Sequence, residues 1–310
     1  MTAPALPACL TEKRPAWRQT AWRQTAWRLL ILLLRITVLV VLTITGVLLL
    51  FQHRVIYHPQ PYPPGVPLRA GIERVEFTTA EGRQVCWWVP GRANDVVWLC
   101  FASEHRQGRD AMKVLVTGAA GNAGQARMWH DFLPDPEQGL LLIEFPGYGD
   151  SAGNASPASI MAASDGAVAV LRQRLGSLPP LAVLGHSLGA AAALQFAAAQ
   201  TRAGTPVSRI ILIAPFTRLV DMARLVVGWP LCHLLRHRYD NQLCLREIIA
   251  GPQPLPRIDI FHGLNDTLIP PAMSRTLAGE SPTIKRHEIA GADHNDVLIE
   301  IIPALQVLIR

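Results

Sequence analysis

Short apolar runs alternate with helical patterns along most of the chain. The runs expected to form strands are 72–78, 83–89, 96–102, 113–117, 139–145, 181–185, 209–215, 257–263 and 284–291. Hydrophobic residues recurring three or four positions apart predict helices at 159–175, 188–200, 270–278 and 296–309. Strands that are apolar throughout and alternate with helices indicate a mostly parallel, doubly wound sheet covered on both faces. The first two runs flank Ala80–Gly82 and predict an opening hairpin. Residues 71–310 are therefore expected to form one α/β domain.

Two segments depart from this alternation. Between residues 96 and 117 there are two strand candidates where one is needed, so either 96–101 is an additional edge strand or 103–112 is an insertion. Residues 216–256 contain Trp-Pro and Gly-Pro breaks and the basic sequence HLLRHR. We interpret 216–256 as a short cap inserted over the site, and a solvent-exposed pair of connecting helices is the alternative.

The longest apolar stretch, Leu29–Phe51, has 23 residues and Arg35 as its single charge. As a helix it would be about 34 Å long, enough to cross a hydrocarbon core of about 30 Å. It is long for a signal peptide, and FQHRVIYHP offers no small-x-small cleavage site, so we expect an uncleaved transmembrane anchor rather than a cleaved signal. Residues 1–28 form a basic tail with an AWRQT repeat, and the five prolines of 52–70 predict a linker.

The net charge of +6 is concentrated at the start of the chain. Residues 1–35 hold six basic side chains and one acidic one, which leaves 23 basic and 22 acidic side chains in the remaining 275 residues. A nearly neutral folded part argues against nucleic acid as a partner. Basic residues before the span predict a cytoplasmic N-terminus, with 52–310 on the far side of the membrane. That side is the periplasm in a Gram-negative bacterium, and a lumen or the exterior otherwise; the pattern does not indicate an oligomeric state.

Five cysteines occur without CxxC spacing, so no zinc site is expected. Cys232 and Cys244 are close enough in sequence to pair in an oxidising compartment, although buried free thiols are favoured for most of the five. The glycine-rich stretch GAAGNAG has neither GxGxxG spacing nor a GKS/T ending, which argues against nucleotide binding. These residues therefore indicate neither a zinc site nor a nucleotide site.

The strongest chemical signal is Gly185-His186-Ser187-Leu188-Gly189, which lies between an apolar strand and an alanine-rich helix. This is the arrangement of a nucleophile elbow, in which a serine occupies a strained turn at the carboxyl edge of the sheet. The flanking glycines remove side chains that would collide with the neighbouring strand and helix. The motif predicts Ser187 as a nucleophile.

A serine nucleophile needs a base, and the following strands supply candidates. Asp266 follows the strand that ends in HG, 79 residues after Ser187, and His294 follows the next strand 28 residues later. His294 would be the general base, and Asp266 would orient it and stabilise its cationic form. As alternatives, Asp266 could cap the helix that starts near Pro270, and the charged neighbours of His294 could be surface groups.

These motifs resemble the α/β-hydrolase superfamily, and within it the membrane-anchored serine hydrolases with a single span. The resemblance covers residues 50–300 and is carried by FQHRVIYHPQ, VEFTTAEGRQVCWWVP, GAAGNAG, LLLIEFPGYGDSAG, GHSLG, FHGLNDTLIP and GADHNDV. It implies hydrolysis of carboxylic esters, thioesters or similar acyl bonds of a small or lipid-derived substrate, without a cofactor. A serine peptidase on the same triad and a non-catalytic scaffold are the alternatives.

The same resemblance implies an oxyanion hole built from two backbone N–H groups. One is that of Leu188, directly after the serine. The family usually carries His-Gly-Asn or Gly-Gly-Asn after its third strand, whereas this chain has TGAAGNAG at 117–124. Two alignments of this stretch are possible, so the second donor is either Ala119 or Asn122.

Overall fold

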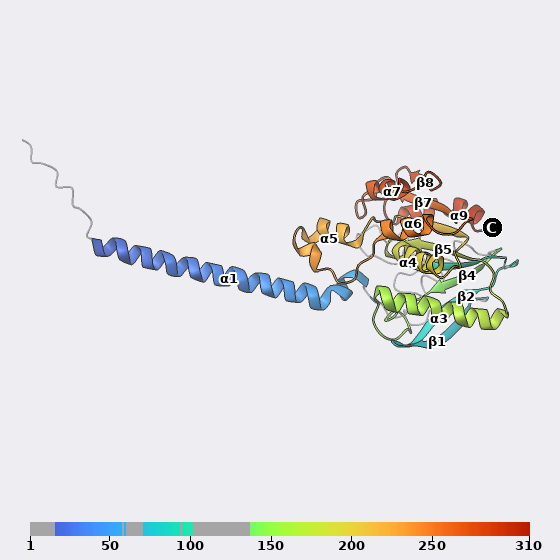
Figure 1. Cartoon of the computed structure of the whole chain (residues 1–310), viewed down its shortest axis with the longest axis horizontal. Helices are drawn as coiled ribbons and strands as arrows, with labels where there is room; N and C mark the ends of the chain where they lie inside the picture. The colour runs from blue at the N-terminus through green and yellow to red at the C-terminus, as the bar shows by residue number, and fades with distance from the viewer. Residues whose placement is uncertain (1–15, 58, 60–70, 94, 102–136) are drawn as a thin grey trace, which may run out of the picture. The chain divides into compact units, whose positions relative to one another are not determined.

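A computed structural model describes residues 16–57, 59, 71–93, 95–101 and 137–310 (Figure 1). The chain divides into two compact units, Met1–Leu50 and Phe51–Arg310. The first unit contains most of one long helix, and the second contains the α/β domain.

Helix α1 (Ala16–Tyr57) includes the expected membrane anchor. Its segment Gln24–Val47 is long and apolar enough to cross a membrane and is not buried inside the protein. The hydroxyl groups of Thr37 and Thr43 donate to helix carbonyls four residues earlier, at 2.9 and 2.8 Å. These polar groups are therefore satisfied within the helix, as a position in lipid requires.

The end of α1 differs from the prediction. Residues 52–57, expected to begin a linker, are helical, and Tyr57 is 2% exposed within the core of the second unit. Within the described residues the helix ends at Tyr57, two residues before Pro59. The remainder of the expected linker, 60–70, lies outside the described residues.

The second unit is built on an eight-stranded sheet in the order β1-β2-β4-β3-β5-β6-β7-β8. The strands are β1 (Glu73–Thr79), β2 (Gly82–Val89), β3 (Val97–Phe101), β4 (Gly139–Ile143), β5 (Leu181–His186), β6 (Arg209–Ile213), β7 (Arg257–Gly263) and β8 (Lys285–Ile289). The pairs β1–β2 and β2–β4 are antiparallel, and every other pair is parallel. The expected mostly parallel sheet and its opening hairpin are confirmed.

The position of β3 shows whether residues 96–101 form an additional edge strand. Strand β3 pairs with β4 on one side and β5 on the other, so 96–101 is a central strand and not an additional edge strand. The second candidate, 113–117, lies outside the described residues. The connection that follows β3 contains both Ala119 and Asn122.

Two apolar cores cover the two faces of the sheet, because successive side chains of a strand point in opposite directions. In β3, Leu99 and Phe101 join one core, and Trp98 and Cys100 join the other. The first core is covered by α3 (Pro157–Leu175), α4 (Leu188–Arg202), α6 (Asn241–Ile249) and α7 (Pro271–Ala278). The second is covered by α8 (Asp296–Glu300) and α9 (Ile302–Leu308). Figure 1 shows α3, α4 and α6 on the same side of the sheet.

The segment expected to be a cap, 216–256, contains α5 (Leu219–Val227), a short 3₁₀ helix η3 (Leu231–Leu234) and α6. Leu245 and Ile248 of α6 are buried in the first core, so α6 belongs to the body of the domain. Helix α5 has no fully buried residue. The part that lies outside the helical layers is therefore shorter than predicted, and consists of about residues 218–239.

Candidate active site

Ser187 lies in a sharp turn between β5 and α4. Its backbone has φ 56° and ψ −120°, a left-handed conformation that is unfavourable for residues other than glycine. The turn is held by two backbone hydrogen bonds: Ser187 N–H donates to Ile213 O at 2.9 Å, and Ala190 N–H donates to Ser187 O at 3.0 Å. The serine side chain does not cap α4, so its hydroxyl is not used to stabilise the helix. This geometry is that of a nucleophile elbow.

Gly185 is required where β5 and α4 approach each other. A Cβ atom at this position would lie 2.3 Å from the carbonyl oxygen of Gly189 and 2.6 Å from the backbone nitrogen of Ala190. Both are backbone atoms at the start of the helix and cannot rotate away. The structure thus supports the reason given for glycine at position 185.

Asp266 and His294 are in contact, as their positions after consecutive parallel strands predict. His294 Nδ1 donates to Asp266 Oδ2 at 2.7 Å, and the two residues are 6% and 5% exposed. The other carboxylate oxygen, Oδ1, accepts the backbone N–H groups of Leu268 and Ile269 at 2.9 and 2.8 Å. Asp266 therefore orients His294 and does not cap α7, whose N-cap is Pro270 without a side-chain hydrogen bond.

A second histidine on the same carboxylate was missed by the sequence analysis. His262 Nε2 donates to the carbonyl of Ile269 at 2.9 Å and lies 3.2 Å from Asp266 Oδ2. Burial opposes ionisation of Asp266, but hydrogen bonds from His262 and then His294 outweigh it and hold the pKa of Asp266 below its usual range. The signal available in the sequence was the i, i+4 spacing of His262 and Asp266 across the end of β7.

His294 also contacts the elbow. The imidazole rings of His186 and His294 lie 4.8 Å apart between centroids, and His186 Nε2 is 3.0 Å from the carbonyl oxygen of His294. The residue directly before Ser187 is thereby packed against the candidate base. Because Nδ1 of His294 donates to Asp266, its Nε2 is an acceptor in the neutral ring. This buried atom has no hydrogen-bond partner among the described residues.

Of the three oxyanion candidates, the structure describes one. Leu188 is the first residue of α4, where the positive end of the helix dipole favours negative charge. Ala119 and Asn122 lie outside the described residues. Within the described part of the chain, no group of three or more His, Cys, Asp or Glu side chains could hold a metal ion.

The chain is similar to known families and proteins. The family described as "Thioesterase domain" matches residues 114–223, about a third of the chain, which include Ser187. Protein bem46 of Schizosaccharomyces pombe is 25% identical over 279 residues, which cover 84% of this chain and 85% of that protein. The uncharacterized protein YfhR of Escherichia coli is 26% identical over 220 residues (69% and 67%). The lysophosphatidylserine lipase ABHD12 of Danio rerio is 23% identical over 217 residues (65% and 55%).

Solved structures share the fold at lower sequence identity. An α/β hydrolase from Vibrio vulnificus superposes with a TM-score of 0.58 at 14% identity, covering 77% of this chain and 80% of that structure. The esterase Pf2001 of Pyrococcus furiosus superposes with a TM-score of 0.57 at 14% identity, covering 82% and 96%. Together with the strand order, these similarities show that the chain has the α/β-hydrolase fold.

Proposed function

We propose that the chain is a serine hydrolase that cleaves carboxylic esters or thioesters through an acyl-enzyme, with Ser187, His294 and Asp266 as its triad. One observation carries the proposal: the buried Nε2 acceptor of His294, which is oriented by Asp266 and packed through His186 against the strained serine turn. A base positioned in this way removes the proton that makes a serine hydroxyl a poor nucleophile.

The reaction follows from these positions. Ser187 Oγ attacks the acyl carbon as its proton passes to His294 Nε2, and the resulting imidazolium is stabilised by the ionised Asp266. The Leu188 N–H, with a second backbone donor at Ala119 or Asn122, would hold the oxyanion. Collapse of the intermediate expels the alcohol or thiol, which takes its proton from His294. Water then attacks the acyl-enzyme with His294 again acting as base. The bond between the acyl carbon and Ser187 Oγ breaks as His294 returns the proton to Oγ, and the acid product leaves.

The known relatives support an acyl bond as the target. The matched family is a thioesterase domain, and the relative from Danio rerio is a lysophosphatidylserine lipase, so both names refer to hydrolysis of ester-type bonds. The class of substrate proposed here is a small or lipid-derived acyl ester or thioester. We further propose a single-pass topology with a cytoplasmic N-terminus, supported by the apolar span and the basic residues before it.

The chemistry is tested by labelling the full chain in detergent with a fluorophosphonate, which reacts with activated serines. Labelling of the wild type, and none in Ser187→Ala or His294→Ala, is expected. His287→Ala is the matched control, because His287 Nε2 is also held by a buried carboxylate, that of Asp259, at 2.9 Å. A folded wild-type protein that is not labelled, or one whose labelling survives Ser187→Ala, would refute the assignment.

A substrate panel separates the remaining alternatives. Para-nitrophenyl esters and acyl thioesters report esterase and thioesterase activity, and aminoacyl anilides report peptidase activity. Turnover of the anilides alone would replace the proposal by a serine peptidase. Absence of turnover on every substrate, with no fluorophosphonate labelling, would indicate a non-catalytic scaffold.

A further inference from the structure

The segment 218–239, here called the cap surface, exposes large apolar side chains. Leu225, Val226 and Trp229 are 61%, 79% and 74% exposed, and α5 has no buried residue. Single exposed hydrophobic residues are common on proteins and need no explanation. Three within five positions of one short segment are an apolar patch of the kind that marks an interaction surface.

The charge of the cap surface indicates the kind of partner that it binds. Residues 218–239 have a net charge of +3, because they contain one acidic residue, Asp221, and four arginines, Arg218, Arg224, Arg236 and Arg238. All residues from 36 to 310 together have a net charge of +1, so positive charge is concentrated on this segment. Exposed leucine, valine and tryptophan beside arginine is the composition of a surface that binds anionic lipid bilayers.

The cap surface is also tied to the chain that follows the membrane span. The backbone N–H of Arg236 donates to Gln52 Oε1 at 2.7 Å. The ring of Tyr57 packs against that of His237 at 5.4 Å between centroids, and its hydroxyl is 3.4 Å from that of Tyr239. These contacts all lie within the second unit.

This attachment keeps the cap surface within reach of a bilayer. Tyr57 follows Val47, the last residue of the candidate span, by ten residues of the same helix. Ten residues of chain span at most about 36 Å in any conformation. The length of the chain alone therefore keeps a segment attached to residues 52–57 within about that distance of the end of an inserted span.

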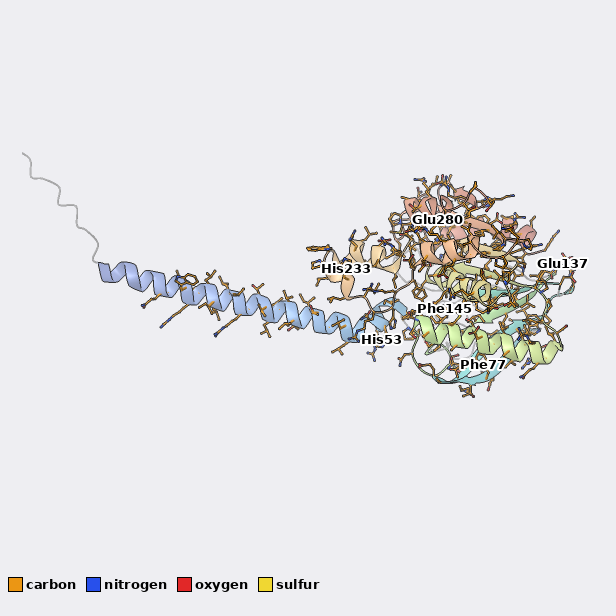
Figure 2. All side chains as sticks on the ribbon, viewed as in Figure 1. His53, Phe77, Glu137, Phe145, His233 and Glu280 are labelled. Carbon is orange, nitrogen blue, oxygen red and sulfur yellow. The ribbon has the colours of Figure 1, made fainter. Side chains whose placement is uncertain are left out.

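The cap surface lies on the side of the candidate active site. In Figure 2, Glu137 and Phe145, which precede and follow β4, mark opposite ends of the sheet, and His233 lies beyond the Phe145 end. Ser187, Asp266 and His294 all follow the carboxyl ends of parallel strands, which is the end marked by Phe145. A membrane against the cap surface would thus face the edge of the sheet that carries the site.

We propose that the cap surface docks on the anionic bilayer in which α1 is anchored, so that the active site receives acyl esters directly from that bilayer. The choice of substrate rests on the proposed hydrolase function, whereas the docking itself does not. Leu225, Val226 and Trp229 enter the interface between headgroups and acyl chains, and Arg224 and Arg236 pair with lipid phosphates. Arg218 and Arg238 already donate to Asp221 and to backbone carbonyls of the segment.

The docking is tested with a fluorophore placed on the cap surface. Val226→Cys, in the full chain with Cys9→Ser and Cys244→Ser, is labelled with nitrobenzoxadiazole and reconstituted into nanodiscs of phosphatidylcholine and phosphatidylglycerol. Val307→Cys, 67% exposed on α9, is the matched control. Spin-labelled lipid is expected to quench the fluorophore at 226 and not the one at 307. Equal quenching at both positions, or a label at 226 that is shielded without lipid by another protein copy, would overturn the proposal.

The consequence for substrate is tested by introducing negative charge into the apolar patch. Leu225→Glu with Val226→Glu is expected to reduce hydrolysis of a long-chain ester embedded in the nanodisc roughly tenfold or more, since two apolar side chains no longer enter the lipid. Hydrolysis of a soluble short-chain ester and fluorophosphonate labelling should be unchanged, and Val307→Glu should affect neither substrate. Equal loss on both substrates, or no loss on either, would refute the inference. A wild type that hydrolyses neither ester would instead refute the proposed function.

Discussion

Asp266→Asn replaces one oxygen atom of a buried side chain, and the surrounding donors determine where the new NH₂ group must lie. Oδ1 accepts two backbone N–H groups, from Leu268 and Ile269, so the amide oxygen of asparagine has to remain there. The NH₂ group then takes the place of Oδ2 and faces the ring nitrogens of His294 and His262 at 2.7 and 3.2 Å. His294 can accept from this group only if Nδ1 loses its proton.

The expected loss of turnover in Asp266→Asn follows from the tautomer that the new NH₂ group imposes on His294. With Nδ1 as an acceptor, the proton of the neutral ring moves to Nε2, which then cannot take the proton of Ser187. The histidine also loses the negative charge that stabilises its imidazolium. In a serine protease triad this change lowers turnover by about 10⁴-fold, or about 5.5 kcal/mol of transition-state stabilisation. His262, whose Nε2 already donates to Ile269, meets a second donor, which should destabilise the fold by about 1–3 kcal/mol.

The assay compares initial rates on a para-nitrophenyl ester, and rates of fluorophosphonate labelling, for the purified full chain and its variants. Asp259→Asn is the control: Asp259 is 2% exposed, accepts from His287, and lies in β7 away from the elbow. Asp266→Asn should lose about four orders of magnitude in rate while Asp259→Asn loses less than tenfold. The reasoning is refuted if folded Asp266→Asn keeps more than a tenth of wild-type activity.

Three further predictions concern stability and reactivity. Gly185→Ala should lower the free energy of unfolding by about 1–3 kcal/mol and slow fluorophosphonate labelling, because its Cβ would overlap backbone atoms of α4. In the control Gly279→Ala the new Cβ would have no neighbour closer than 3.3 Å, so the melting temperature should change little. Equal melting temperatures of the two variants would contradict this prediction. The lowered pKa of Asp266 contributes stability that is complete above about pH 4 and is lost as the pH falls toward the folded-state pKa. The melting temperature of the wild type should therefore fall more steeply below pH 4 than that of Asp266→Asn. Parallel curves of melting temperature against pH would refute this linkage. Burial raises the pKa of the Cys86 thiol to about 12 and raises that of Cys100 as well, so neither should react with maleimide at pH 7.5 until the chain unfolds, as peptide mapping by mass spectrometry would reveal.

The order of elements and the main site could be predicted because their signals are local. Each strand is a short apolar run, and the turn at Ser187 needs glycines at fixed offsets. Asp266 and His294 could be paired because consecutive parallel strands end at the same edge of the sheet. Their hydrogen bond at 2.7 Å agrees with that expectation, while their catalytic roles remain a prediction.

Other features could not be predicted because they depend on contacts distant in sequence. An apolar run does not reveal its neighbours, so 96–101 fitted an edge strand as well as the central position that it occupies between β4 and β5. His262 lies inside a buried strand, and its i, i+4 spacing from Asp266 became informative only once the fold showed that β7 ends between the two residues. The prolines after residue 58 suggested a linker, but Tyr57 gains a buried position that extends α1 up to them.

The position of β8 at the edge of the sheet has a consequence for inactivation. Within the described sheet β8 pairs only with β7, and its side chains are mostly exposed, whereas β5, which carries Ser187, is central and buried. Edge elements with few buried contacts open at a lower free energy than the whole domain. Opening of β8 would move the loop that bears His294 away from Asp266 while the elbow stays folded. Heat and denaturant should therefore abolish activity reversibly before the domain unfolds. The free energy of opening β8 would then limit activity, and the larger free energy of global unfolding would limit the fold.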